Sequence, residues 1–130
     1  MSHPIPLKRI TLHLARSKEH PDGSSRHGYE FLAPLTAEGR LDPVVWRDAR
    51  AACRVRRFWV GEKEETGHLV HRSGGKGGAT WAFDYDPAAT GDEEAGYRFG
   101  DHPMVVGEYL SVKDEDGEMH TFKVVSVTAA

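Results

Sequence analysis

Short runs in which every second residue is apolar recur along this chain, and they constrain its fold more than any other feature. In residues 7–16, Ile10, Leu12 and Leu14 share one side, while Arg9 and Thr11 lie on the other. A period of two is typical of a half-buried β-strand, because successive side chains point to opposite faces. Similar short segments, rich in β-branched or aromatic residues, occupy 29–32, 55–60, 68–72, 80–85, 97–99, 105–114 and 118–128. We therefore expect six to eight short strands.

The connections between these runs indicate how the strands pair. Most are short and contain glycine, and the Asp116-Gly117 pair between the last two runs is a strong hairpin signal. No alternation of strands with helices suggests a parallel sheet. The expected fold class is mostly β with one short α-helix, as a small antiparallel, partly open barrel or rolled sheet with the helix covering one face or end.

We expect residues 1–130 to form a single domain, since this length is typical of one. Within it the sequence predicts a polar loop at about 17–28, an acidic loop at about 86–96 and a C-terminal hairpin at about 105–128.

The helix is predicted at about 43–54. Asp42 suits the N-cap, Pro43 suits the first helical position, and Leu41 can pack on Trp46. An apolar stripe at helical spacing is expected to dock on the sheet; it consists of Val45, Ala49, Ala52 and Cys53.

Composition narrows the classes of function. The single cysteine excludes an internal disulfide and a Cys-based zinc site, and no apolar run approaches the length of a membrane span. We expect a cytoplasmic protein that does not contact a membrane, and we predict no cofactor.

The net charge of −3 hides an asymmetry, because residues 1–80 carry 14 Lys and Arg against 9 Asp and Glu, and residues 81–130 carry 3 against 11.

A cationic and aromatic cluster is the sharpest candidate site. Arginine forks bind phosphates and aromatic faces stack on bases, so such a cluster can hold an anionic ligand. The alternative is that acidic residues of the C-terminal half neutralise the arginines while the aromatic rings fill the core. The predicted anion-binding residues are Arg47, Arg50, Arg54, Arg56, Arg57, Trp59 and Lys76.

Histidines suggest a second, metal-binding hypothesis. Imidazole suits several divalent metals, and a site can assemble from distant strands. The candidate ligands are His71, His102, His120 and Asp84, and Tyr97 joins them if the pocket binds a small molecule. His68 and His71 do not make a pair on one strand, since a spacing of three points them to opposite faces.

Other motifs are less specific. The glycine-rich segment 74–78 lacks the order of a P-loop and is expected to be a hairpin loop. Cys53 is expected to be a small core residue. Asp114, Asp116 and Glu118 resemble the start of a calcium loop, but their spacing excludes an EF-hand.

These features favour a non-enzymatic binding or adaptor module that uses the Arg/Trp surface for an anionic macromolecule, nucleic acid included, or a protein partner. One alternative is a small enzyme or a metal- or ligand-binding β-barrel with a His/Asp pocket. Another is a homo-oligomeric structural subunit, such as a dimer formed through unpaired strand edges.

Overall fold

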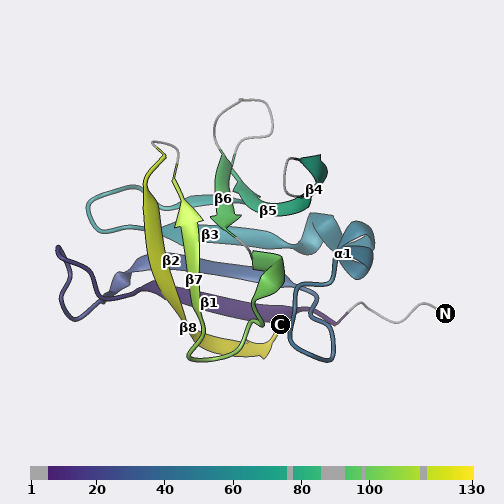
Figure 1. Cartoon of the computed structure of the whole chain (residues 1–130), viewed down its shortest axis with the longest axis horizontal. Helices are drawn as coiled ribbons and strands as arrows, with labels where there is room; N and C mark the ends of the chain where they lie inside the picture. Colours follow the sequence, from purple (N-terminus) through teal and green to yellow (C-terminus); the bar gives the residue numbers. More distant parts are fainter. Residues whose placement is uncertain (1–5, 76–77, 86–92, 98, 115–116) are drawn as a thin grey trace.

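Eight strands follow one another along the chain, and each pairs with its neighbours in antiparallel register to form a closed barrel (Figure 1). The computed structural model describes residues 6–75, 78–85, 93–97, 99–114 and 117–130. The strands are β1 (Lys8–Leu14), β2 (Ser24–Ala33), β3 (Arg54–Phe58), β4 (Glu65–Gly75), β5 (Gly78–Asp84), β6 (Glu93–Tyr97), β7 (Tyr109–Lys113) and β8 (Met119–Ala129). The helices are α1 (Pro43–Ala49) and the short 3-10 turns η1 (Arg50–Ala52) and η2 (Phe99–Asp101).

The predicted fold class is confirmed: the protein is mostly β and antiparallel, with one short α-helix. The first strand closes the barrel because it pairs on both sides. Leu12 of β1 lies opposite Tyr29 of β2 and opposite Val124 of β8. Each described strand therefore has a neighbour on either side, which removes the unpaired edges on which the dimer hypothesis relied.

Several predicted boundaries shift. Strand β2 begins at Ser24, inside the segment 17–28 that was expected to be a loop. Strand β6 occupies Glu93–Tyr97, so it begins inside the expected acidic loop 86–96 and ends at the first residue of the expected strand 97–99; residues 86–92 of that loop lie outside the described residues. In both segments pairing with neighbouring strands outweighs the low β-propensity of glycine and acidic residues.

The C-terminal hairpin forms from β7 and β8, so its strands begin at Tyr109 and end at Ala129. The expected glycine-rich loop 74–78 is shorter than predicted, because β4 extends to Gly75 and β5 begins at Gly78.

Aromatic rings fill the middle of the barrel. Tyr29 lies with its ring centroid 4.9 Å from that of Phe83 and 5.1 Å from that of Phe122, and Phe31 lies 5.2 Å from Phe83. All four side chains are buried. An eight-stranded barrel has an interior that side chains can just fill, so open space is expected at its ends and on its outer surface.

The helix begins as predicted and ends early. The Asp42 carboxylate accepts hydrogen bonds from the amides of Val44 (3.0 Å) and Val45 (3.1 Å), with Pro43 at the first helical position. Its α-helical part stops at Ala49 rather than near residue 54, because η1 follows and the chain enters β3 at Arg54.

The buried face of this segment also differs from the predicted stripe. Trp46, Ala49 and Cys53 are buried, whereas Ala52 is exposed. Trp46 anchors the helix to the barrel, since its indole Nε1 donates a hydrogen bond of 2.9 Å to the carbonyl of Leu69 on β4. None of the helices in the described residues has the length and apolar character that a bilayer crossing requires.

We predict that Phe122→Ala destabilises the barrel by about 3–5 kcal/mol, because it removes a fully buried ring and leaves a cavity between Tyr29 and Trp59. Urea unfolding followed by circular dichroism measures the change. Val106→Ala, at a side chain that is 64% exposed, is the control and should stay within about 0.5 kcal/mol of wild type. Equal losses in the two variants would contradict a core centred on these rings.

Candidate functional site

The five arginines predicted to form one anion-binding surface divide into two groups. Arg56 forms ion pairs with Glu64 (3.0 Å) and Glu30 (3.6 Å), and Arg57 forms one with Glu62 (3.1 Å). These two guanidinium groups are neutralised within the chain. Trp59 lies beneath the Arg57 guanidinium, which is 4.7 Å from its ring centroid, so the predicted Trp59 belongs with this neutralised group.

Arg47, Arg50 and Arg54 make up the second group. All three are exposed, and the structure places no carboxylate of the described residues within ion-pairing distance of them. Strand alternation explains part of the division. Val55 and Arg57 point into the barrel, whereas Arg54 and Arg56 point outward. The predicted Lys76 lies outside the described residues.

A groove runs between the helical segment and the outside of β4 and β5, and we call it the α1 groove. Its cavity has a volume of about 380 Å³. The lining residues are Trp46, Arg50, Ala51, His68, Leu69, Val70, His71 and Asp84. Arg54 borders it, because Arg54 lies opposite His68 in the pairing of β3 with β4.

The α1 groove has a largely apolar floor with a few polar groups at its rim. The Arg50 guanidinium lies 6.0 Å from the Trp46 ring centroid, and the His71 ring packs 4.4 Å from Trp81. Burial lowers the pKa of His71, and the positive charge of Arg47 lowers it further. A neutral His71 is thus favoured, with the groove's fixed positive charge supplied by arginine.

The predicted histidine site is not assembled. His71 and Asp84 both line the α1 groove. His102 instead lies 3.6 Å from Glu108, and His120 lies 3.0 Å from Asp114 near the tip of the last hairpin. The side chain of Tyr97 is outside what the structure describes.

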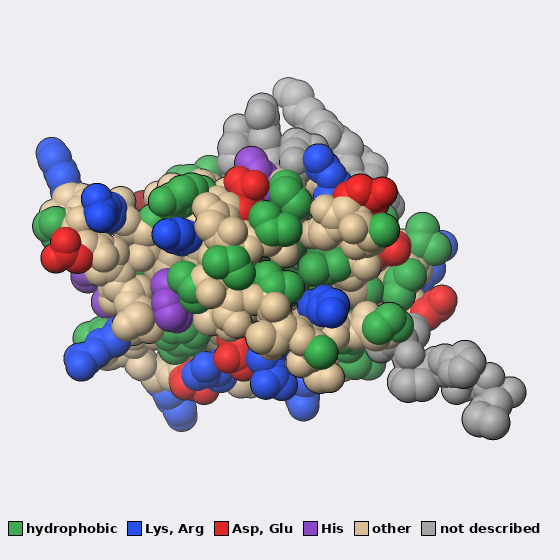
Figure 2. Space-filling view, turned by 90° about the horizontal axis from the view of Figure 1, so that it is seen from below, with side chains coloured by type: hydrophobic (Ala, Val, Ile, Leu, Met, Phe, Trp, Pro, Cys, Tyr) green, Lys and Arg blue, Asp and Glu red, His purple; other side chains and the backbone are tan. Residues whose placement is uncertain are grey.

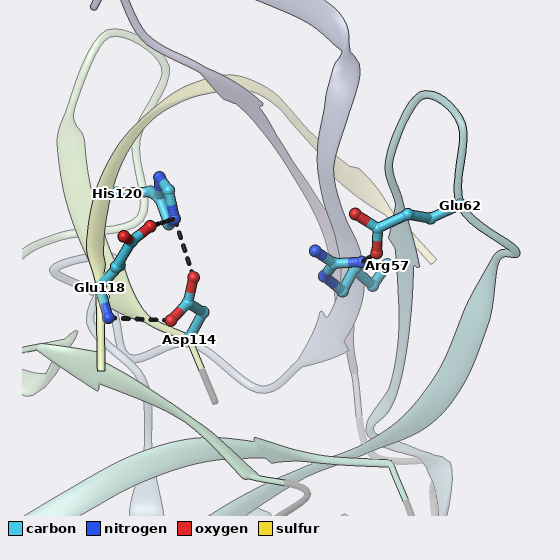
Figure 3. A network of polar contacts seen from close by, with 5 residues as sticks. All are labelled: Arg57, Glu62, Asp114, Glu118 and His120. Carbon is cyan, nitrogen blue, oxygen red and sulfur yellow. Dashed lines mark hydrogen bonds and ion pairs between the residues drawn. The ribbon is translucent and has the colours of Figure 1, made fainter. Parts of the chain in front are cut away.

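A second set of polar side chains gathers at the barrel end where β3 finishes and the β1–β2 connection passes, and we call it the mouth cluster (Figure 3). Its members are His20, His27, Arg57, Trp59, Glu62, Asp114, Glu118 and His120. Figure 3 shows Asp114, Glu118 and His120 on one side and the Arg57–Glu62 pair on the other. Trp59 connects the two sides, since its ring centroid is 5.7 Å from that of His120.

Asp114, Glu118 and His120 form the only group of three possible metal ligands that the described residues bring together. We call them the Asp–Glu–His group. His120 Nε2 is 3.0 Å from Asp114 Oδ2 and 3.9 Å from Glu118 Oε2. The histidine hypothesis included His120, whereas Asp114 and Glu118 were considered only as the start of a calcium loop and were not joined to it. Alternation along β8 carried part of the signal, because His120 shares a face with the buried Phe122 and Val124.

His27 is buried inside the mouth cluster. Its Nδ1 lies 2.6 Å from the Ser24 hydroxyl oxygen, and its ring packs 4.5 Å from Trp59 and 4.8 Å from His20. Burial lowers the pKa of His27, as do the neighbouring His20 and Arg57, while Glu62 acts in the opposite direction. Sequence reasoning assigned His27 to a solvated loop and therefore missed it.

On the face drawn in Figure 2, Lys and Arg side chains are interspersed with Asp and Glu, so this face carries no broad field of one sign. Charged ligands are consequently expected at a local arrangement of side chains such as the α1 groove. No family model, curated protein or solved structure matches this chain.

We predict that acid destabilises the protein through His27 and His71. Their folded-state pKa values lie below the ordinary value of 6.5, so the unfolded chain binds more protons as the pH falls below that value. The stabilising contribution is full above the unfolded-state pKa and is lost as the pH falls toward the folded-state pKa. Urea unfolding at several pH values should show a weaker acid dependence in His27→Gln/His71→Gln than in wild type; equal dependence contradicts this assignment.

We also predict that Cys53 resists alkylation in the folded protein. The side chain is fully buried, and burial raises the pKa of its thiol to about 11. A chromogenic disulfide reagent at pH 8 should label it only after denaturation. Rapid stoichiometric labelling of the native protein would be incompatible with this burial.

Proposed function

We propose that this protein is a non-catalytic binding module whose α1 groove holds an anionic group of its ligand. The single observation that carries the proposal is that Arg47, Arg50 and Arg54 stand beside this groove with no carboxylate of the described residues in ion-pairing distance.

The shape of the α1 groove supports this proposal. Ligand sites are concave and mainly apolar, with a few polar groups that fix orientation. Val70 and Ala51 offer an apolar surface, and Arg50 and His68 stand beside it. A ligand that carries a phosphate or carboxylate next to an apolar or planar part fits this combination.

Charge supports an anion over a cation. Among the described residues that line the groove, Asp84 is the only one with a carboxylate, and Asp48 is exposed on α1. Arg50 lines the groove as well, Arg54 borders it, and Arg47 is close enough to lower the pKa of His71. Guanidinium groups remain charged at all physiological pH values and bind phosphate or carboxylate through two parallel hydrogen bonds. The net charge of −3 makes a small or locally bound anion a better fit than a long polyanion.

We predict that the triple variant Arg47→Gln/Arg50→Gln/Arg54→Gln weakens binding of inorganic polyphosphate and of a short single-stranded RNA, the two probes to be tested. Loss of three charge-assisted contacts, at about 1 kcal/mol each, corresponds to weakening on the order of a hundredfold. Tryptophan fluorescence at low salt measures the binding, since Trp46 lines the groove. Wild-type affinity should fall steeply as salt is added.

The matched control is Lys18→Gln/Arg26→Gln/Lys63→Gln, which removes the same charge from exposed sites outside the groove. It should bind like wild type. If neither probe binds wild type at low salt, or if both triple variants lose affinity equally, the proposed function fails. Binding of RNA but not polyphosphate would identify a nucleic-acid ligand, and the reverse would identify a phosphate-rich one.

A further inference from the structure

The ligand atoms of the Asp–Glu–His group converge at the mouth of the barrel, away from the α1 groove. One carboxylate oxygen of Asp114, one of Glu118 and one ring nitrogen of His120 all lie within 4.8 Å of one another. We infer that this group binds a divalent transition-metal ion such as Zn²⁺ or Co²⁺. This inference goes beyond the proposed function and uses none of the residues that line the α1 groove.

The distances suit a single ion. Zinc binds imidazole nitrogen at about 2.0–2.1 Å and carboxylate oxygen at about 2.0–2.2 Å, so an imidazole nitrogen and a carboxylate oxygen of one ion lie at most about 4.3 Å apart. His120 Nε2 lies 3.0 Å from Asp114 Oδ2 and 3.9 Å from Glu118 Oε2, both below that limit. The Glu118 side chain is 74% exposed, so it can adjust to complete the geometry.

The hairpin holds two of the ligands in place. Asp114 Oδ1 accepts a hydrogen bond of 2.9 Å from the Glu118 amide, which leaves Oδ2 directed at His120 (Figure 3). The main chains of Asp114 and Glu118 are paired as well, since the Asp114 amide donates to the Glu118 carbonyl at 2.8 Å. These two hydrogen bonds therefore hold the Asp114 carboxylate and the main chain at Glu118 in place before any metal arrives, and the Glu118 side chain is left to adjust to the ion.

Charge favours a cation at this point. The group brings two carboxylates to one imidazole nitrogen, and both kinds of atom are ligands of divalent transition metals. Asp114 and His120 are largely shielded from solvent, with side chains 21% and 30% exposed, so water screens their interaction with a bound ion less than at a fully exposed site. A divalent ion offsets both charges. Mixed nitrogen and oxygen ligands favour a transition metal over Ca²⁺, which prefers oxygen alone.

The site is also accessible. Glu118 and His120 line a cavity of about 590 Å³, together with Trp59 and His20. Three protein ligands leave at least one coordination position of a zinc ion for water or a small ligand that enters through this cavity.

The test titrates untagged protein with Zn²⁺ by isothermal calorimetry and with Co²⁺ by tryptophan fluorescence. Wild type should bind one Zn²⁺ stoichiometrically, and Co²⁺ should quench Trp59, whose ring lies 5.7 Å from His120. Glu118→Gln and His120→Gln should each weaken Zn²⁺ binding at least about tenfold, since loss of an outer-shell partner alone costs about 10–100-fold. Trp59→Phe should lose the quenching and keep the heat of Zn²⁺ binding.

The matched control is Glu19→Gln, which removes an exposed carboxylate that lines the same cavity but lies outside the Asp–Glu–His group. It should bind Zn²⁺ within about twofold of wild type. Glu118→Gln alters an exposed side chain, so a folding defect does not confuse the result. The inference fails if wild type binds no Zn²⁺ stoichiometrically, if Glu118→Gln and His120→Gln bind like wild type, or if Co²⁺ quenches Trp59→Phe as strongly as wild type. Polyphosphate binding is measured separately, so failure here leaves the α1 groove proposal standing.

Discussion

The packing of Tyr29, Phe31, Phe83 and Phe122 inside the barrel is the constraint on which the rest of the structure depends. These rings come from β2, β5 and β8, so strands far apart in sequence must curl around one set of side chains. A flat sheet would leave half of that apolar surface in water, at a cost of about 25 cal/mol for each Å² exposed. Pairing of β1 with β8 closes the barrel and covers this apolar surface. Because the rings fill the interior, space for small ligands remains at the barrel ends and in grooves on the outside.

Side chains alternate between the two faces of each strand, so the inward face that buries apolar residues in the core also carries polar residues near the end of the barrel. On β8, the face that buries Phe122 continues to His120, and on β3 the face that buries Val55 continues to Arg57. Near the barrel end these positions still point inward, where water is partly excluded. A polar group that is partly removed from water requires a partner within the protein. His120 is paired with Asp114, and Arg57 is paired with Glu62. The mouth cluster is thus the polar continuation of the core.

Much of the architecture could be predicted from sequence because its signals are local. Period-two alternation marks strands, Asp42-Pro43 marks a helix start, and Asp-Gly marks the last hairpin. The helix ended early because three-dimensional docking of Trp46 on Leu69 decides where the chain turns back, and no local signal encodes that contact. Likewise β2 extends to Ser24 because β1 offers it a partner.

The candidate site was harder to predict, because residues that are close in sequence do not always lie on the same face of the fold. Grouping arginines by their nearness in sequence placed Arg56 and Arg57 together, although neighbouring residues on a strand face opposite ways. Arg57 enters the barrel mouth and pairs with Glu62 across a turn, whereas Arg54 stays outside beside His68. An inward guanidinium loses hydration and requires a carboxylate, as Arg57 does, whereas an outward one keeps its water and is paired only where neighbouring strands supply acids, as Glu30 and Glu64 do for Arg56. The described residues place no such acid beside Arg47, Arg50 or Arg54, so the charge of these three arginines is not neutralised by an ion pair among those residues.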